Sequence, residues 1–257
     1  MTAPRASVAE SFRLEGKRAL VTGAGRGIGL AAAGALAEMG ASVTLAARTI
    51  TQIESAAEAI RQKGGNADCL AIDVTDLAAV SAAIETRAPF HILINNAGTN
   101  RTAPFLEVKL EDFDLIMGLN VRAAFFVAQA MARQLASSGE GGSIVNISSQ
   151  MGLVGAATRS VYCASKWAME GMTRAMAVDL APYHIRVNTI CPTFVETPLA
   201  NSFLKNPTFK ADVLSKIKLG RVGTVADLLG AIVLLASDAS SLMTGSSLVI
   251  DGGWTAD

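Results

Sequence analysis

The sequence predicts a single α/β domain built on one doubly wound parallel sheet of about seven strands, with helices on both faces. Short apolar runs of four to six residues recur along the chain, nearly continuous in Val, Ile, Leu and Ala. Strands buried on both faces of a parallel sheet have this composition. Longer segments with helical spacing separate the runs, as in doubly wound sheets with right-handed crossovers. A length of 257 residues, 51% of them hydrophobic, fits one domain over residues 1–257.

Each predicted strand is an apolar run that ends at a turn or a polar residue. In chain order, the predicted strands are Arg18–Thr22, Ser42–Ala46, Ala67–Ile72, His91–Ile94, Ser143–Ile147, Ile185–Ile190 and Ser247–Ile250. The predicted helices are Gly27–Met39, Ile50–Lys63, Asp76–Thr86, Glu111–Ser137, Ser160–Leu180 and Val225–Ala236. Sheets of this kind bind ligands at the carboxyl ends of their strands, so the residues that follow each strand are the candidates for a site.

Two segments depart from this rhythm. Residues 1–13 alternate small and polar side chains without the apolar stretch of a signal peptide, and we expect a loose tail. Residues 198–220 form a longer connection than the fold needs, with Pro207 and scattered apolar residues. A long segment at the ligand end of the sheet is typical of a substrate lid, and a pair of surface helices is the alternative.

Composition argues against several classes of partner. The formal net charge is zero, whereas nucleic-acid and anionic-membrane binding needs a basic surplus. No apolar run approaches the roughly 20 residues that span a bilayer. Cys69, Cys163 and Cys191 are too scattered for a disulfide framework, and His91 and His184 lie outside any ligand cluster, so we expect no metal. A reducing cytoplasm is the expected location.

A glycine-rich turn connects the first strand to an alanine-rich helix. Glycines let backbone N–H groups approach a pyrophosphate, and the start of a helix offers unpaired donors. The spacing is G-x-x-x-G-x-G, yet its position between a buried strand and a helix favours a dinucleotide cradle over an empty turn. The residues of this candidate cradle are Gly23, Gly25, Arg26, Gly27, Ile28 and Gly29.

The residue that reads the adenosine ribose is expected after the second strand. An acid at that place favours NAD(H), but this chain has Ala47 followed by Arg48. The planar guanidinium of Arg48, helped by Arg26, suits a 2′-phosphate, so we predict NADP(H) as the preferred cofactor. If Arg48 instead stacks on adenine or faces solvent, NAD(H) remains usable. Asp73 after the third strand and Asn96 after the fourth are candidates for adenine and ribose contacts, or for turn chemistry.

A candidate acid–base group follows the fifth strand. Tyr162 and Lys166 are spaced i, i+4 and share one face of a predicted helix. An ammonium nearby lowers the pKa of a phenol from about 10 towards neutrality, where proton transfer is most effective. Ser149, at the end of a neighbouring strand, is placed to hydrogen-bond the substrate oxygen. From pattern alone, Asn120 fits a solvated or helix-bonding asparagine as well as a functional one.

Together these motifs resemble the short-chain dehydrogenase/reductase family over nearly the whole chain, which implies a Rossmann-like fold. Asn120, Ser149, Tyr162 and Lys166 look like the family's catalytic tetrad. By that resemblance, Tyr162 transfers the proton, Ser149 orients the substrate, Lys166 binds the nicotinamide ribose and Asn120 holds a water.

The resemblance also implies further cofactor contacts. The motif Asn95-Asn96-Ala97-Gly98 matches the central-strand motif of the family. The expected contact residues are Asp73 and Val74 at adenine, Asn96, Ala97 and Gly98 along the cofactor, and Val195 and Thr197 at the carboxamide. One departure from the family is Pro192-Thr193, where Pro-Gly is usual, and this side chain is expected to narrow the pocket. The family is usually tetrameric, so a homotetramer (or a dimer) is expected, with Glu111–Ser137 and Ser160–Leu180 at one interface.

Three functions agree with these residues. The leading one is an NADP(H)-dependent carbonyl reductase, with 3-oxoacyl thioesters as one substrate option. The second is an NAD(H)-dependent sugar, polyol or sugar-acid dehydrogenase. The third is a cofactor-sensing protein on the same fold, although it would have no need for proton-transfer residues. Arg101 and Arg159 near the expected pocket suggest an anionic or strongly polar substrate, unless both are ordinary surface arginines.

Overall fold

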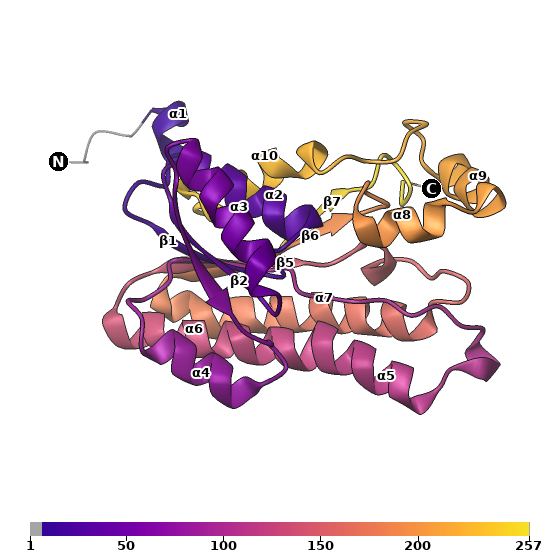
Figure 1. The fold of residues 1–257 in the computed structure, drawn as a ribbon, viewed down its shortest axis with the longest axis horizontal. Helices are drawn as coiled ribbons and strands as arrows, with labels where there is room; N and C mark the ends of the chain where they lie inside the picture. The colour runs from indigo at the N-terminus through magenta and orange to yellow at the C-terminus, as the bar shows by residue number, and fades with distance from the viewer. Residues whose placement is uncertain (1–6, 257) are drawn as a thin grey trace.

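A seven-stranded parallel sheet forms the centre of the molecule in the computed structural model, which describes residues 7–256, apart from the side chains of residues 199 and 202 (Figure 1). The strand order is β3-β2-β1-β4-β5-β6-β7. The strands are β1 (Arg18–Thr22), β2 (Ser42–Ala47), β3 (Asn66–Ala71), β4 (Ile92–Asn95), β5 (Gly142–Ile147), β6 (Ile185–Pro192) and β7 (Ser247–Ile250). This is the predicted Rossmann-like, doubly wound sheet, and the strand order reverses between β1 and β4.

Helices cover both faces of the sheet (Figure 1). One face carries α2 (Gly27–Glu38), α3 (Ile50–Gln62) and α10 (Ala226–Ala236). The other carries α4 (Leu77–Glu85), α5 (Leu110–Met117), α6 (Ala124–Ser138) and α7 (Ser160–Leu180). All six predicted helices are present, with ends that differ by one or two residues at most places, apart from the interruption between α5 and α6.

Two hydrophobic clusters hold these layers together, one on each face. Along β1 the side chains alternate: Val21 packs towards α2 and α10, whereas Leu20 packs towards α6. The inner strands are buried on both sides, as their continuous apolar runs predict. The edge strands β3 and β7 are only partly buried, because each has a neighbouring strand on one side alone.

The predicted helix Glu111–Ser137 is interrupted in the structure. A π-helical segment, Gly118–Ala123, separates α5 from α6. The whole stretch Leu110–Ser138 is long and apolar enough to cross a membrane, although polar residues are scattered along it. Its buried side chains, among them Val127, Met131 and Leu135, pack against the sheet, as expected for a core helix.

The two segments that depart from the rhythm both contain helices. Within the expected loose tail, residues 1–6 lie outside the described part, and α1 (Val8–Ser11) follows. The Ser7 side chain accepts from the Glu10 N–H, and the Glu10 carboxylate accepts from the Ser7 N–H, so a reciprocal cap organises this part of the tail. Residues 198–220 contain α8 (Pro198–Leu204) and α9 (Pro207–Lys216).

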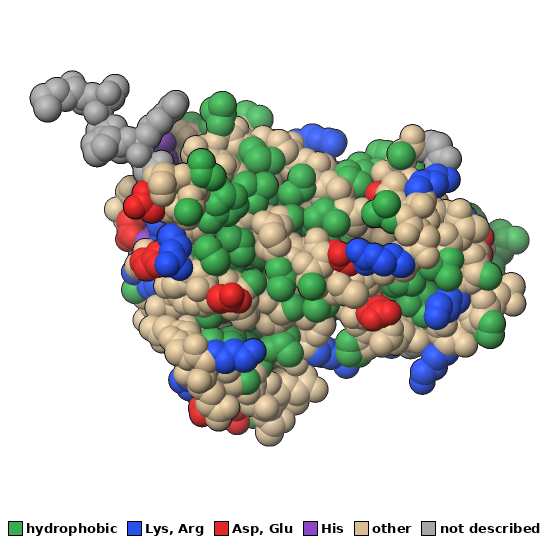
Figure 2. All heavy atoms as spheres, turned by 90° about the horizontal axis from the view of Figure 1, so that it is seen from above, with side chains coloured by type: hydrophobic (Ala, Val, Ile, Leu, Met, Phe, Trp, Pro, Cys, Tyr) green, Lys and Arg blue, Asp and Glu red, His purple; other side chains and the backbone are tan. Residues whose placement is uncertain are grey.

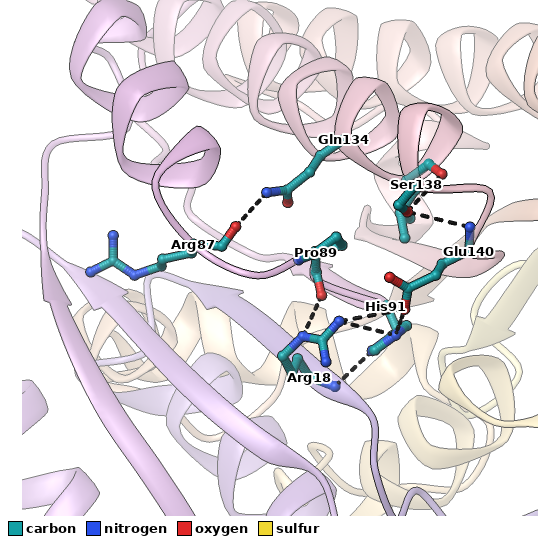
Figure 3. Close-up of polar contacts among 8 residues, drawn as sticks. Arg18, Arg87, Pro89, His91, Gln134, Ser138 and Glu140 are labelled. Carbon is teal, nitrogen blue, oxygen red and sulfur yellow. Dashed lines mark hydrogen bonds and ion pairs between the residues drawn. The ribbon is translucent and has the colours of Figure 1, made fainter.

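A polar cluster closes the amino end of the sheet, away from the predicted site (Figure 3). The Arg18 main-chain N–H donates to His91 Nδ1 at 3.0 Å, so Nδ1 carries no proton and Nε2–H donates to Glu140. Burial lowers the pKa of His91, and the bond with His91 lowers the pKa of Glu140. The cluster therefore joins β1, the start of β4 and the connection before β5 through a neutral imidazole.

Candidate active site

One cavity lies where β4, β5 and β6 end, at the carboxyl edge of the sheet. Its walls come from the turn after β1, the loops after β4 and β5, the first turns of α7 and the segment after β6. Eight predicted site residues line it: Ile28, Asn96, Gly98, Ser149, Tyr162, Lys166, Val195 and Thr197. The fold thus brings the predicted acid–base group and the inner half of the predicted cofactor site to one place.

Tyr162 and Ser149 meet inside this cavity. Tyr162 lies in the first turn of α7 and is half-buried, and Ser149 follows the end of β5. The Ser149 hydroxyl donates to Gln150 Oε1 at 2.7 Å. Burial raises the pKa of the Tyr162 phenol, while a hydrogen bond with Ser149 and the charge of Arg159 lower it. The protein alone therefore leaves Tyr162 protonated, as the proton donor in a reduction must be.

Lys166 lies one turn further along α7 with its ammonium buried. Its Nζ donates to the carbonyl of Ile147 at 2.8 Å and lies 5.6 Å from the centre of the Tyr162 ring. Burial lowers the pKa of Lys166 to about 8. In the protein alone, the nearby cation whose charge lowers the pKa of the Tyr162 phenol is Arg159.

Asn120 is neither solvated nor bonded to its own helix. It is fully buried in the π-helical segment, where its Oδ1 accepts from the Thr99 N–H at 2.8 Å. Its Nδ2 donates to the Thr99 carbonyl and to Ser165 Oγ, at 2.9 and 3.1 Å. The asparagine ties the loop after β4 to α7 next to Lys166, and irregular π turns of this kind are frequent at functional sites.

The glycine-rich turn has the backbone that a phosphate cradle requires. Gly23 and Gly27 have φ of 65° and 60°, in the left-handed region. A Cβ on Gly29 would lie 2.5 Å from the Gly23 carbonyl, so this glycine lets α2 pack closely on the turn. No side chain caps the start of α2, so its first N–H groups remain available to a pyrophosphate. These residues fit a dinucleotide cofactor.

The side chain of Asn96 stabilises that turn by hydrogen bonds. Its Nδ2 donates to the carbonyls of Thr22 and Gly23, at 3.0 and 3.2 Å. The Thr22 hydroxyl accepts from the N–H groups of Asn96 and Ala97. The side-chain amide of Asn96 therefore holds the β1 turn against the end of β4.

The outer half of the predicted cofactor site lies at the ends of β2 and β3. Arg48 is 78% exposed, and its Nη1 lies 3.9 Å from Asp73 Oδ2. Asp73 accepts from the Thr75 N–H, an Asx turn, and this bond lowers the pKa of its carboxyl group. The side chain of Val74 packs in the core below. Arg48 is thus held loosely, with its N–H groups free to meet an anion.

Comparison with known proteins agrees with this geometry. A family model described as enoyl-(acyl carrier protein) reductase matches residues 23–255. The chain is 41% identical to D-erythrulose reductase from Gallus gallus over 244 residues, which is 95% of this chain and 97% of that protein. The chain belongs to the short-chain dehydrogenase/reductase family.

Other members of the family match equally completely. Gluconate 5-dehydrogenase from Gluconobacter oxydans is 40% identical over 248 residues, covering 95% of this chain and 96% of that protein. The crystal structure of a gluconate 5-dehydrogenase from Burkholderia cenocepacia, in complex with NADP and tartrate, has a TM-score of 0.94 and 37% identity. That match covers 98% of this chain and 100% of the other. The resemblance and the predicted fold class are confirmed, and this short-chain dehydrogenase/reductase is an oxidoreductase acting on CH–OH and C=O groups.

The structure separates the two arginines that were expected near the pocket of this dehydrogenase/reductase. Arg159 is buried, with 4% of its surface exposed, and lines the cavity. Arg101 is exposed, does not line the cavity, and lies 4.0 Å from Asp112. The prediction of a pocket arginine therefore holds for Arg159 and not for Arg101, although Thr99 and Asn100 of the same loop do line the cavity.

Sequence reasoning missed part of the wall of the cavity. Phe194, between Thr193 and Val195, lines it, whereas Phe203 of α8, which also lines it, belongs to the segment expected as a lid. An aromatic residue directly after β6 was the available signal, because that strand also ends at the ligand edge of the sheet. Thr193, at the departure from the family pattern, lines the cavity as expected, and its hydroxyl has no hydrogen-bond partner.

Proposed function

We propose that this short-chain dehydrogenase/reductase interconverts a secondary alcohol and a ketone on a sugar, polyol or sugar acid, with NADP(H) as cofactor. The observation that carries the proposal is the meeting of Ser149, Tyr162 and Lys166 around one cavity beside the glycine turn. The relatives named above reduce or oxidise sugars and sugar acids, which supports the same class of substrate. A protein that only senses the cofactor would not need this acid–base group.

The reaction requires proton transfer at the substrate oxygen, and the residues of this chain provide it. The bound cofactor supplies or accepts the hydride. During reduction, Tyr162 donates its phenolic proton to the carbonyl oxygen, and Ser149 holds that oxygen by a hydrogen bond. The bond from Ser149 to Gln150 fixes the serine rotamer before substrate arrives. Lys166 would hold the nicotinamide ribose, and Asn120 keeps the loop after β4 against α7 beside it.

Unpartnered polar atoms in the cavity favour a substrate rich in hydroxyl groups. Gln150 Nε2, Asn100 Oδ1 and Thr193 Oγ1 are buried without a hydrogen-bond partner, and all three residues line the cavity. A buried polar atom without a partner costs about 1–3 kcal/mol, so a ligand that satisfies it gains that much. Sugars and polyols supply such groups, whereas the acyl chain of a 3-oxoacyl thioester does not. A sugar substrate is therefore favoured over the thioester.

Arg48 supports the choice of NADP(H). It follows β2, where an acid would repel a 2′-phosphate, and its guanidinium is exposed beside the cradle. Neighbouring structures of this family contain NADP, among them the one from Burkholderia cenocepacia. A preference for NADPH over NADH follows from the charge at this position.

The segment 198–220 is proposed as the substrate lid. Ala200 and Phe203 of α8 reach the cavity. The base of the segment is closed by main-chain bonds, from Glu196 N–H to Gly223 O at 2.8 Å and from Gly223 N–H to Phe194 O at 2.9 Å. α8 and α9 therefore extend from one closed base, while the end of the segment is bonded to the C-terminal part of the chain, from Leu219 N–H to Gly252 O at 3.0 Å.

A homotetramer in the cytoplasm completes the proposal. On the face of α5, α6 and α7, several large hydrophobic side chains are exposed: Phe113, Leu115, Phe125, Phe126 and Trp167. Hydrophobic side chains also reach the surface on the opposite face, over α2 and α10 (Figure 2). Two apolar faces suit a subunit with two interfaces. The cysteines Cys69, Cys163 and Cys191 are free thiols, as in a reducing compartment.

Turnover with matched substrate classes tests the proposal. The purified protein is assayed with NADPH against four- to six-carbon ketoses and keto acids, and against an acetoacetyl thioester. We expect NADPH oxidation with a sugar-type ketone, strongly reduced in Tyr162→Phe. Efficient reduction of the thioester, with no sugar, polyol or sugar acid turned over in either direction, would contradict the proposed substrate class.

A further inference from the structure

Arg159 is buried among aromatic rings at the wall of the cavity. It immediately precedes α7, and its guanidinium carbon lies 4.8, 5.4 and 5.7 Å from the ring centres of Phe203, Phe209 and Phe194. Phe203 and Phe209 belong to α8 and α9, and Phe194 follows β6. The rings favour a cation through their π faces, and they offer no strong acceptor for its N–H groups.

No acidic side chain in the described part of the chain neutralises this charge. Among the described residues, no carboxylate forms an ion pair with Arg159, and the groups that act on its charge are Tyr162 and Cys163. Arg18, Arg48 and Arg101, by contrast, each lie within 4.0 Å of a carboxylate, although all three are more exposed. Burying a cation without a partner anion costs free energy. The buried position of Arg159 therefore indicates that an anion from outside the chain completes this site.

The position of Arg159 relative to Tyr162 shows where such an anion would lie. The two residues are three apart at the start of α7, and both line the cavity. Arg159 is close enough for its charge to lower the pKa of the Tyr162 phenol. An anion on Arg159 would therefore belong to the same molecule whose carbonyl group meets Tyr162.

We propose that Arg159 binds a carboxylate of the substrate, so that the substrate is a sugar acid rather than a neutral sugar or polyol. This inference rests on the proposed function and narrows it. The guanidinium forms two parallel hydrogen bonds with a carboxylate. Asn100, Gln150 and Thr193 are then left for the hydroxyl groups of the same ligand. Since two of the rings come from the lid, binding of the anion also connects substrate recognition to the position of α8 and α9.

Two merely structural roles predict different results. Arg159 could serve only to hold the rings of Phe203 and Phe209 against α7, or only to tune Tyr162. In the first case its replacement lowers the melting temperature without changing which substrate is preferred. In the second, it lowers turnover of charged and neutral substrates equally.

Substrate pairs that differ only in the carboxylate separate these cases. D-gluconate and D-glucitol form one pair for oxidation, and 5-keto-D-gluconate and L-sorbose form one for reduction, with four- and five-carbon pairs added. We expect the wild type to prefer the acid of the productive pair, and Arg159→Gln to raise its KM about 10–100-fold. The neutral member should change by less than about threefold. Arg159→Lys, which keeps the charge but not the fork, should restore part of the preference, and Arg101→Gln is the matched control.

A binding measurement keeps the inference testable without turnover. Calorimetric titration with D-gluconate and with tartrate should show binding to the wild type that Arg159→Gln loses. Similar melting temperatures of the two proteins show that the variant is folded. A preference of the wild type for the neutral member of every productive pair would overturn the assignment, as would equal loss on both members. If no sugar or sugar acid is turned over but carboxylate binding still depends on Arg159, the proposed function is wrong and the anion site is confirmed. If there is neither turnover nor Arg159-dependent binding, both the function and the anion site are wrong.

Discussion

Lys166 Nζ donates to the carbonyl of Ile147 at 2.8 Å, which places a buried ammonium at the end of β5 beside Tyr162. The bond joins α7 to the sheet at the base of the cavity. Burial lowers the pKa of Lys166 from 10.5 to about 8, so the folded protein keeps this charge only at a cost in stability. Such costs are typical of functional residues.

The first prediction is that Lys166→Met stabilises the protein and abolishes activity. At pH 7 we expect a gain of about 1–3 kcal/mol, because each pKa unit corresponds to about 1.4 kcal/mol and the lost hydrogen bond returns about 1 kcal/mol. Below pH 8 the wild type bears the full cost, and as pH rises from 8 to 10.5 the unfolded chain keeps a proton that the folded one releases. The difference in stability therefore shrinks over that window. Denaturant unfolding measures it, and a variant less stable than the wild type at pH 7 would contradict the expectation.

The second prediction concerns the proton donor. Tyr162→Phe should lower kcat by about 10²–10⁴-fold, the contribution expected of a positioned general acid. The Tyr162 hydroxyl forms a hydrogen bond with Ser149 and is not part of the hydrophobic core, so the variant should fold and still bind the cofactor. Steady-state kinetics and fluorescence titration with NADPH measure the two quantities. Retained turnover in a folded variant would assign the proton transfer to another group.

Cofactor choice can be tested at Arg48. Arg48→Asp should weaken NADPH binding about 10–100-fold, because a charge-assisted hydrogen bond to the 2′-phosphate contributes about 1.5–3 kcal/mol. NADH affinity should stay the same or improve, since an acid accepts from the ribose hydroxyls. Each cofactor is titrated separately, and Arg101→Asp, a charge reversal outside the cavity, is the control. Tighter binding of NADH than NADPH by the wild type would remove the role given to Arg48.

The fourth prediction is a loss of stability in mild acid that depends on His91 (Figure 3). The pKa values of His91 and Glu140 are both lowered in the folded state, from 6.5 and 4.5, so the unfolded chain binds more protons as pH falls. The contribution of these two groups to the free energy of unfolding should be fully present above pH 6.5. It should decline below that pH, first as His91 takes up a proton and then, below 4.5, as Glu140 does.

His91→Asn separates this effect from general acid denaturation. Its Oδ1 can still accept from the Arg18 N–H, which in the wild type donates to Nδ1 at 3.0 Å, but it does not titrate. We expect a lower melting temperature at pH 7.5 and a flatter decline between pH 6.5 and 5. An unchanged slope in His91→Asn would place the titration elsewhere.

Local pattern was sufficient for most of the fold. β1 and β7 have the predicted bounds, because each apolar run ends where the chain must turn. The interruption at Gly118–Ala123 was not predicted, because the apolar pattern of this segment also fits a continuous α-helix, and the bonds of Asn120 to Thr99 join it to a loop distant in the sequence.

For the site, spacing along the chain determined which residues carry chemistry, and the tertiary structure decided what each one meets. Tyr162 and Lys166 are one helical turn apart in any helix, so their pairing is a property of the sequence alone. Arg101 and Arg159 are indistinguishable in sequence, but one pairs with Asp112 at the surface and the other is buried among rings from three segments. The physical reason is that burial and charge compensation depend on neighbours far apart in the chain. Helical spacing depends only on residues four positions away.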